Sequence, residues 1–158
     1  MSVIDIELAM AHLHAEPEDQ ALVQMQLDAS EDAAMRYLQR RFFVDSATVA
    51  AAKAETTLRT RDARGVYAIS RAEADLPENS DIRCRLIDQA RQALADAYED
   101  IDMDQYSIVI NPSVQAACLL KLGHLFANRE EVVTGTIATE LPLASKSLLA
   151  PYRIRMGV

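Results

Sequence analysis

Apolar side chains recur at steps of three and four residues along most of this chain, which is the spacing of one face of an α-helix. The pattern predicts four main helices: Asp5–His14, Pro17 to about Arg41, Asp81 to about Asp100, and Pro112 to about Asn128. Asn111 followed by Pro112 is a strong helix start, because Asn accepts hydrogen bonds from free N–H groups and Pro fits the first helical position. The run Ser107–Ile110 is predicted to be extended.

The pattern changes in the middle of the chain. Ser46–Thr57 is rich in Ala and predicts a helix, whereas the apolar period weakens from Leu58 to Asn79. Gly65 and Pro77 interrupt this second part. We interpret residues 44–106 as a helical insertion with a surface excursion inside it. Ser80 is the expected cap of the following helix.

Composition supports a helical fold. The 158 residues include 26 Ala but 4 Gly and 5 Pro, a balance that favours helices over a β-sandwich or a Gly-rich phosphate-binding fold. Aromatic residues make up 5% and there is no Trp, so the core must be mostly aliphatic. The predicted fold is an all-α, small helical bundle with long antiparallel helices, formed by a single domain over 1–158. It carries the central insertion and an extended C-terminal tail.

Charge is distributed unevenly. Residues 1–106 hold 21 acids and 11 bases, whereas residues 107–158 hold 3 acids and 5 bases. These charges are either ordinary solvated faces or unlike surfaces that meet between neighbouring copies. The overall charge of −8 argues against free nucleic-acid binding. We also expect no membrane span and no signal peptide. Two cysteines are too few for a disulfide scaffold, so a reducing cytoplasm is the expected site of synthesis.

The sequence offers little for catalytic or metal chemistry. His12 and His14 are two residues apart and point to different helix faces. Cys84 and Cys118 lack a second ligand at zinc spacing, so both are predicted to be small core residues. His124 is predicted to be a structural residue of the last long helix. We expect no catalytic residue, no cofactor and no metal.

The most distinctive motifs lie in the C-terminal third. Residues 123–135 read Gly-His-Leu-Phe-Ala-Asn-Arg-Glu-Glu-Val-Val-Thr-Gly, residues 140–143 Glu-Leu-Pro-Leu, and residues 148–153 Leu-Leu-Ala-Pro-Tyr-Arg. Together with Glu-Leu-Ala-Met-Ala-His-Leu at 7–13, they resemble the head–tail connector (adaptor, or head completion) family of tailed phages. The resemblance covers about 4–43 and 108–155. The insertion matches poorly, and Phe126 stands where Tyr is frequent.

This resemblance implies a structural virion protein without catalysis. Such proteins form a homo-oligomeric ring of about twelve copies in the neck, below the portal protein of the filled head. The ring extends the channel for double-stranded DNA, which passes without sequence-specific binding, and it offers a docking surface to a tail or stopper protein. A C-terminal arm, here 148–158, engages the portal. A phage, a prophage and a gene transfer agent are all possible sources.

The residues that carry these motifs are the candidate assembly residues. They are His124, Asn128, Arg129, Glu130, Glu131, Glu140, Pro142, Leu148, Leu149, Pro151, Tyr152 and Arg153. Arg129 is predicted to end the last long helix by meeting exposed carbonyl groups or an acid such as Glu140. That network would orient the loop and tail for assembly.

Two other function classes stay open at this point. One is a prophage-encoded helical regulator or protein-binding module. It would need a basic helix, for which Arg83, Arg85 and Arg91 are the candidates, diluted by Asp81 and Asp88. The other is an enzyme such as a metal-dependent hydrolase, for which the sequence gives no specific motif.

Overall fold

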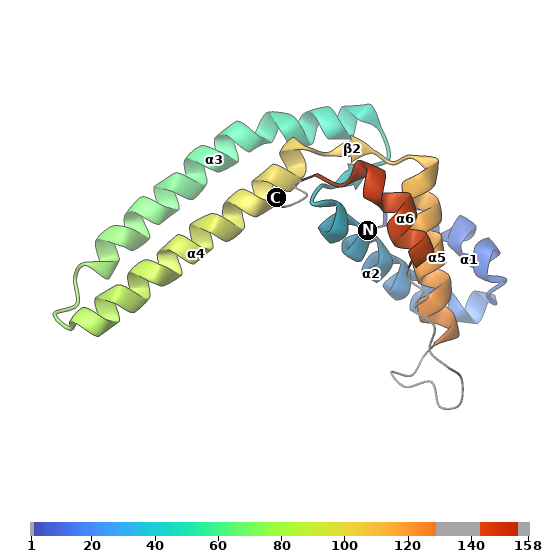
Figure 1. The fold of residues 1–158 in the computed structure, drawn as a ribbon, viewed down its shortest axis with the longest axis horizontal. Coiled ribbons are helices and arrows are strands. Elements are labelled where there is room, and N and C mark those ends of the chain that lie inside the picture. The colour runs from blue at the N-terminus through green and yellow to red at the C-terminus, as the bar shows by residue number, and fades with distance from the viewer. Residues whose placement is uncertain (1, 129–142, 155–158) are drawn as a thin grey trace. The chain divides into compact units, whose positions relative to one another are not determined.

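The computed structural model describes residues 2–128 and 143–154 (Figure 1). Within them, six α-helices and two short strands are present. They are α1 (Ile6–Leu13), α2 (Gln20–Leu38), β1 (Phe42–Phe43), α3 (Ser46–Ala74), α4 (Ser80–Gln105), β2 (Ile108–Val109), α5 (Pro112–Ala127) and α6 (Leu143–Leu149). Single 3-10 turns cover Pro17–Asp19 and Ala150–Tyr152. The prediction of an all-α bundle is confirmed.

The chain divides into two compact units. The first, which we call the bundle, comprises the described residues up to Ser46 and from Ile108 onward. The second, which we call the hairpin, is Ala47–Ser107. The predicted insertion, 44–106, has nearly the same bounds as the hairpin.

The helix ends of the bundle follow from a few local residues. Asp5 caps α1 by accepting a hydrogen bond from the Glu7 backbone, and Asn111 caps α5 by accepting one from Val114. The helix α2 ends at Leu38, earlier than predicted, because Gln39 takes a left-handed conformation with φ of 58°. That turn lets the next residues extend, so that β1 pairs in parallel with β2, with Phe42 opposite Ile108.

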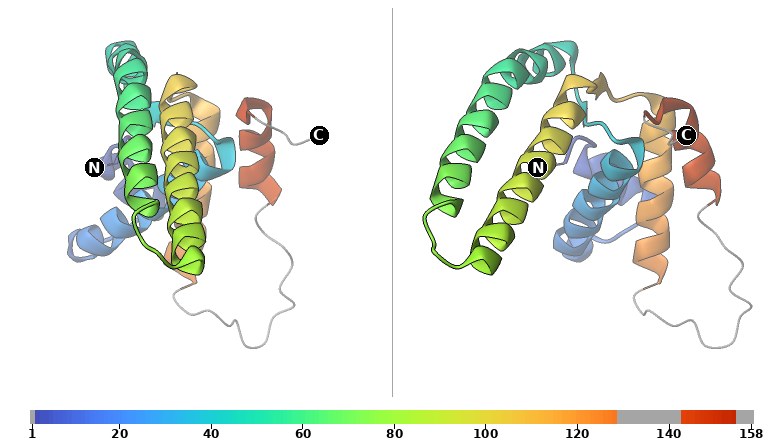
Figure 2. Two further views of the ribbon diagram at one scale, coloured as in Figure 1. Left: turned by 90° about the vertical axis from the view of Figure 1, so that its left-hand side faces the viewer. Right: turned by 60° about the vertical axis from the view of Figure 1, so that its left-hand side comes forward.

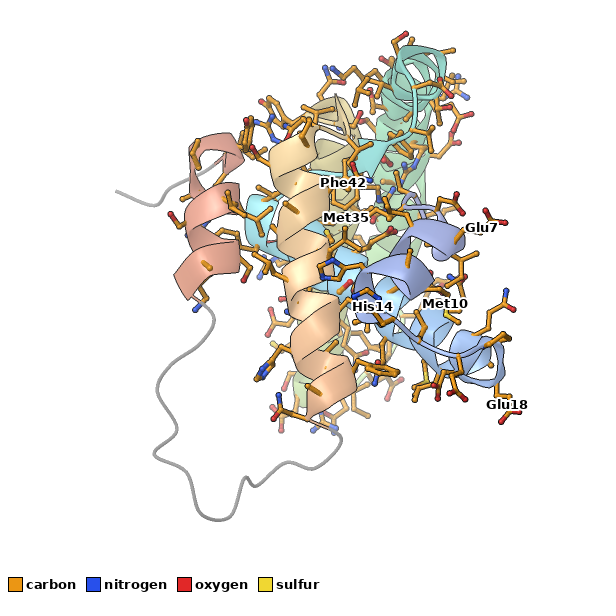
Figure 3. The ribbon with its side chains drawn as sticks, turned by 90° about the vertical axis from the view of Figure 1, so that its right-hand side faces the viewer. Glu7, Met10, His14, Glu18, Met35 and Phe42 are labelled. Carbon is orange, nitrogen blue, oxygen red and sulfur yellow. The ribbon has the colours of Figure 1, made fainter. Side chains whose placement is uncertain are left out.

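The bundle is built on the packing of α2 against α5, with α1 and α6 packed on this pair. Its buried core is aliphatic apart from Phe42 and Cys118, as the composition predicted. It consists of Ile4, Ala9, Val23, Leu27, Ala34, Leu38, Phe42, Val114, Ala117, Cys118, Leu122 and Leu149. Figure 3 shows Met35 and Phe42 beside α5, whereas Glu7 and Glu18 point outward. The helix α5 is thus packed against α1, α2 and α6.

Gly123 lies inside α5, where Gly costs roughly 1 kcal/mol against Ala, and a close approach of another helix backbone would offset that cost. A Cβ at this position would meet two side-chain atoms, His12 Nε2 and Leu13 Cδ2, each at 3.9 Å. These are ordinary van der Waals distances to side chains of α1. Among the described residues, no backbone of another helix makes such an approach here.

The hairpin consists of α3 and α4, which run antiparallel and side by side (Figure 2). The predicted surface excursion after Leu58 is wrong, because α3 is continuous to Ala74. Asp100, Asp102 and Asp104 interrupt the apolar pattern near the predicted helix end at about Asp100, but α4 continues past them to Gln105. Its cap is Asn79, whose side chain accepts from two backbone N–H groups, rather than Ser80.

The apolar pattern weakened in this region because many residues on the inner faces of the two helices are small or polar. We call these faces the seam; its positions recur three and four residues apart and are buried or half-buried. The seam comprises Thr56, Arg59, Ala63, Tyr67, Ser70 and Ala74 on α3, and Ile87, Ala90, Leu94, Ala97, Ile101 and Asp104 on α4.

Polar side chains join the two helices at one end of the seam. The guanidinium of Arg59 binds two carboxylates of α4. Its Nη2 lies 2.5 Å from Asp100 Oδ2, and its Nη1 is bound to Asp104 Oδ2. Hydrogen bonds to these carboxylates raise the pKa of Arg59, although its partial burial opposes this. Thr56 Oγ1 lies 2.8 Å from Gln105 Oε1. The acids expected to break α4 therefore bind its neighbour.

Candidate assembly surface

The candidate assembly residues divide into those the structure describes and those it does not. Outside the described residues lie Arg129, Glu130, Glu131, Glu140 and Pro142. The others lie at the end of α5 or on α6 and the turn after it, all within the bundle. They are His124, Asn128, Leu148, Leu149, Pro151, Tyr152 and Arg153.

The end of α5 is closed by a local hydrogen-bond network. The His124 carbonyl oxygen accepts from the Asn128 backbone at 3.0 Å and from the Asn128 side chain at 2.8 Å. The same side-chain nitrogen lies 3.1 Å from His124 Nδ1. Because the last carbonyls of a helix lack partners, this doubled contact stabilises the end of α5. His124 thus contributes its carbonyl oxygen and a ring nitrogen to the end of α5.

The described part of the predicted C-terminal arm packs on the bundle. Leu149 is buried in the core, and Leu148 and Tyr152 pack against that core. The Ile154 N–H donates to the Leu38 carbonyl at 3.2 Å. Residues 148–154 are therefore docked on α2 and α5 over this length rather than extended away from them.

An aromatic contact holds the same segment on its outer side. The Arg153 guanidinium lies 5.1 Å from the centre of the Tyr37 ring, which is cation–π distance. Arg153 is exposed, whereas Tyr37 is half-buried on α2. The cation therefore stays at the surface and remains accessible to a partner.

A cavity of about 280 Å³ lies where α2, α5 and α6 meet. Its walls include small and apolar side chains such as Ala33, Ala117 and Leu149, and the Tyr37 ring also lines it. Lys121, His124 and Lys146 line it as well and are exposed. The cavity therefore has mostly apolar walls, and its exposed lining residues include two lysines and a histidine.

Sequence reasoning missed Glu31, which holds the N-terminal segment. Its carboxylate accepts from the Val3 N–H at 2.8 Å and from the Ile4 N–H at 2.8 Å, although Glu31 is only 4% exposed. Burial raises the pKa of Glu31, while the two N–H groups oppose that rise. The sequence did contain a signal for this role. Glu31 lies four residues after Leu27 and three before Ala34, at a position where the buried face of the helix usually carries an apolar residue.

The two cysteines have different environments. Cys118 is buried in the bundle core, and burial raises the pKa of its thiol to about 12. Cys84 is exposed on α4, so its predicted core position is wrong.

Other features bear on the alternative functions. Among the described residues, no three His, Cys, Asp or Glu side chains gather as a metal site would require. None of the described helices combines the length and apolar character of a membrane span. On α4, Arg91 lies 3.3 Å from Asp88, and Arg83 donates to the Pro77 carbonyl. Two of the three arginines considered for a basic helix therefore have partners within the hairpin.

Comparison with protein-family models, with curated proteins and with solved structures found no match to this chain.

Proposed function

We propose that this chain is a structural protein of a tailed-phage neck or of a related particle. In this proposal, copies form a ring of about twelve below the portal, extend the DNA channel and receive a tail or stopper protein. Double-stranded DNA passes through the ring without sequence-specific binding. The protein would be synthesised in the bacterial cytoplasm and reside at the head–tail interface of the virion.

The observation that carries the proposal is the grouping of the resembling segments. The motifs fall at 4–43 and 108–155, far apart in the sequence, and their described parts fold into one unit, the bundle. The poorly matching residues form the hairpin, a unit of their own. A common core with an added hairpin is what we expect if the motifs belong to one connector-like domain.

The surface of the bundle supports the proposal in a second way. The docked C-terminal segment presents Arg153 beside Tyr37, and the nearby cavity offers apolar walls with exposed cations. Aromatic and Arg side chains beside an apolar hollow are typical of protein–protein contacts. This surface suits a partner segment that carries apolar and acidic side chains.

The test is reconstitution with the portal protein encoded near this gene. The purified chain is mixed with portal rings, and electron microscopy and native mass spectrometry report the symmetry and mass of the product. We expect an added ring on one face of the portal. A chain that stays monomeric and leaves the portal unchanged contradicts the proposal, whereas monomers in isolation do not, because assembly can require the portal.

Two charge reversals locate the contact. Arg153→Glu should weaken portal attachment at least tenfold, because it places an acid where the proposed partner carries acids. The matched control is Arg91→Glu, which changes an equally exposed arginine on the hairpin and should leave attachment unchanged. Circular dichroism checks that both variants keep their helices. Equal attachment by both variants would exclude the segment at 148–154 as the contact.

A further inference from the structure

The face of α3 turned away from the seam is apolar although it is exposed. We call it the outer face of α3: Ala47, Ala50, Ala51, Ala54, Leu58, Arg61, Asp62, Gly65, Ala68, Ile69 and Ala72. Leu58 is 55% exposed and Ile69 62% exposed. Large apolar side chains on the exposed side of a helix are expected to be covered by another element. Within the hairpin, no described residue covers the outer face.

The corresponding face of α4 is of a different kind. It carries Asp81, Arg85, Asp88, Gln92, Asp96 and Glu99, all exposed. This is the polar surface expected of a helix that faces water. The apolar outer face is therefore particular to α3 and does not follow from the hairpin being an exposed structure.

Eight of the eleven residues of the outer face are related in pairs about the point between Arg61 and Asp62. At equal distances on either side, Leu58 corresponds to Gly65, Ile69 corresponds to Ala54, and Ala51 corresponds to Ala72. Each large side chain thus has a small residue as its counterpart, and the central cation has an anion.

We propose that the outer face of α3 binds the same face of a second copy of this chain, with the two helices antiparallel about a two-fold axis. In that arrangement Arg61 of each copy faces Asp62 of the other. Leu58 enters the space above Gly65, and Ile69 packs over Ala54. A two-fold contact requires a surface that is complementary to itself, and this sequence satisfies the requirement in both size and charge.

The single-chain structure fits this partner. Nothing lies within 4 Å of a Cβ built on Gly65, so the space opposite Leu58 is open. Arg61 and Asp62 form a loose ion pair at 3.5 Å, and both side chains are largely exposed. A weak exposed pair costs little to exchange for two pairs across the axis.

The contact is a modest one. Residues 51–72 span about 30 Å of helix, so the buried surface falls at the small end of specific interfaces. The dimer should therefore form at concentrations on the order of tens of micromolar or above. The inference does not depend on the proposed ring, because a two-fold pair closes on itself and cannot alone generate a ring. Its mass, twice that of the chain, distinguishes it from any portal-bound assembly.

The first test places a side chain in the open space. Gly65→Leu should raise the dissociation constant of the dimer at least tenfold in sedimentation equilibrium, because the new side chain collides with Leu58 of the second copy. The isolated chain should fold at least as well as before, because that space is open and Leu favours helix over Gly. The matched control is Leu76→Ala, which changes an exposed apolar residue beyond the end of α3. Unchanged dimerisation in Gly65→Leu, or a wild-type chain that stays monomeric at several hundred micromolar, overturns the proposal.

The second test uses the central charges. Arg61→Asp gives a chain with two acids at the centre, and Asp62→Arg gives a chain with two cations. Each variant alone should dimerise at least tenfold more weakly than the wild type. An equimolar mixture should recover the dimer as a mixed species, because acids then face cations across the axis. Failure of the mixture to recover association contradicts the pairing.

The third test distinguishes antiparallel from parallel helices. In a Cys84→Ser background, Ala54→Cys and Ile69→Cys chains should form a disulfide-linked mixed dimer on mild oxidation. Each chain alone should link to itself much less. A parallel pair in register gives the reverse result, with self-linked chains, and that outcome overturns the two-fold arrangement.

Discussion

The bundle and the hairpin are both helical, but they hold their helices together differently. In the bundle, aliphatic side chains from several helices close a core, in which Leu27, Leu38 and Leu122 are fully buried. In the hairpin, two helices meet along a seam in which small and polar side chains are mixed with a few large apolar ones, and Arg59 provides a charged link. The bundle thus depends on a core closed by several helices, whereas the hairpin depends on one pair of helices joined partly by directional contacts.

The largest expected effect tests this contrast directly. Leu27→Ala removes a fully buried side chain of the bundle and should lower the free energy of unfolding by about 3 to 5 kcal/mol. Leu58→Ala removes the same atoms from an exposed site on the hairpin and should change it by less than about 0.5 kcal/mol. Urea unfolding at a concentration low enough to keep the chain monomeric measures both. Similar losses would mean that Leu58 is covered in the monomer, against its exposure of 55%.

The next effect concerns the polar exception in the bundle. Glu31→Ala leaves the Val3 and Ile4 N–H groups without their acceptor and should cost about 2 kcal/mol. Hydrogen exchange should show faster exchange at these two amides, with amides of α4 unchanged. If they stay protected, the carboxylate does not hold the N-terminal segment.

Glu31 also gives the bundle a pH dependence whose sign can be worked out. Its pKa is raised in the folded state above the ordinary value of 4.5, so the folded state binds more protons between those two pKa values. Stability contributed by this group is therefore present at low pH and declines as pH rises from about 4.5 through the raised pKa. Glu31→Gln does not titrate, so the stability of the wild type relative to this variant should fall over that range. An opposite trend would contradict the burial of the carboxylate.

A smaller effect is expected where the hairpin is linked. Asp104→Asn keeps the shape of a side chain that is 3% exposed but removes its charge, and should cost about 1 to 2 kcal/mol. The control is Arg91→Ala, which breaks a pair whose two side chains are 67% and 73% exposed and should cost less than about 0.5 kcal/mol. Hydrogen exchange in α3 and α4 measures both. Equal effects would show that the Arg59 link is no stronger than a surface pair.

The same contrast explains what the sequence could predict. The α5 start at Asn111 and the aliphatic core were predictable, because a cap signal and apolar spacing act locally. The continuation of α3 past Leu58 was not predictable from local spacing. Which of its faces is buried depends on contacts with residues of α4 over 40 positions away in the sequence, such as Arg59 with Asp100. Glu31 was missed for a similar reason, since its partners, Val3 and Ile4, belong to another segment. The assembly residues at 129–142 lie outside the described residues and stay predictions.

The smallest effect compares one glycine in each unit. Both Gly65 and Gly123 lie inside helices. Replacement of either by Ala should raise the free energy of unfolding by about 0.5 to 1 kcal/mol, because Ala restricts the unfolded chain and favours the helix. At Gly65 the added methyl group meets nothing within 4 Å, so the increase in the free energy of unfolding should come from helix propensity alone. At Gly123 it meets His12 and Leu13 at 3.9 Å, so a little apolar burial should add to the gain. Urea unfolding of both variants, again with monomeric chains, measures the two gains. A loss at Gly123 would mean that the bundle cannot accept one methyl group between α1 and α5, and that its packing there is tighter than these distances imply.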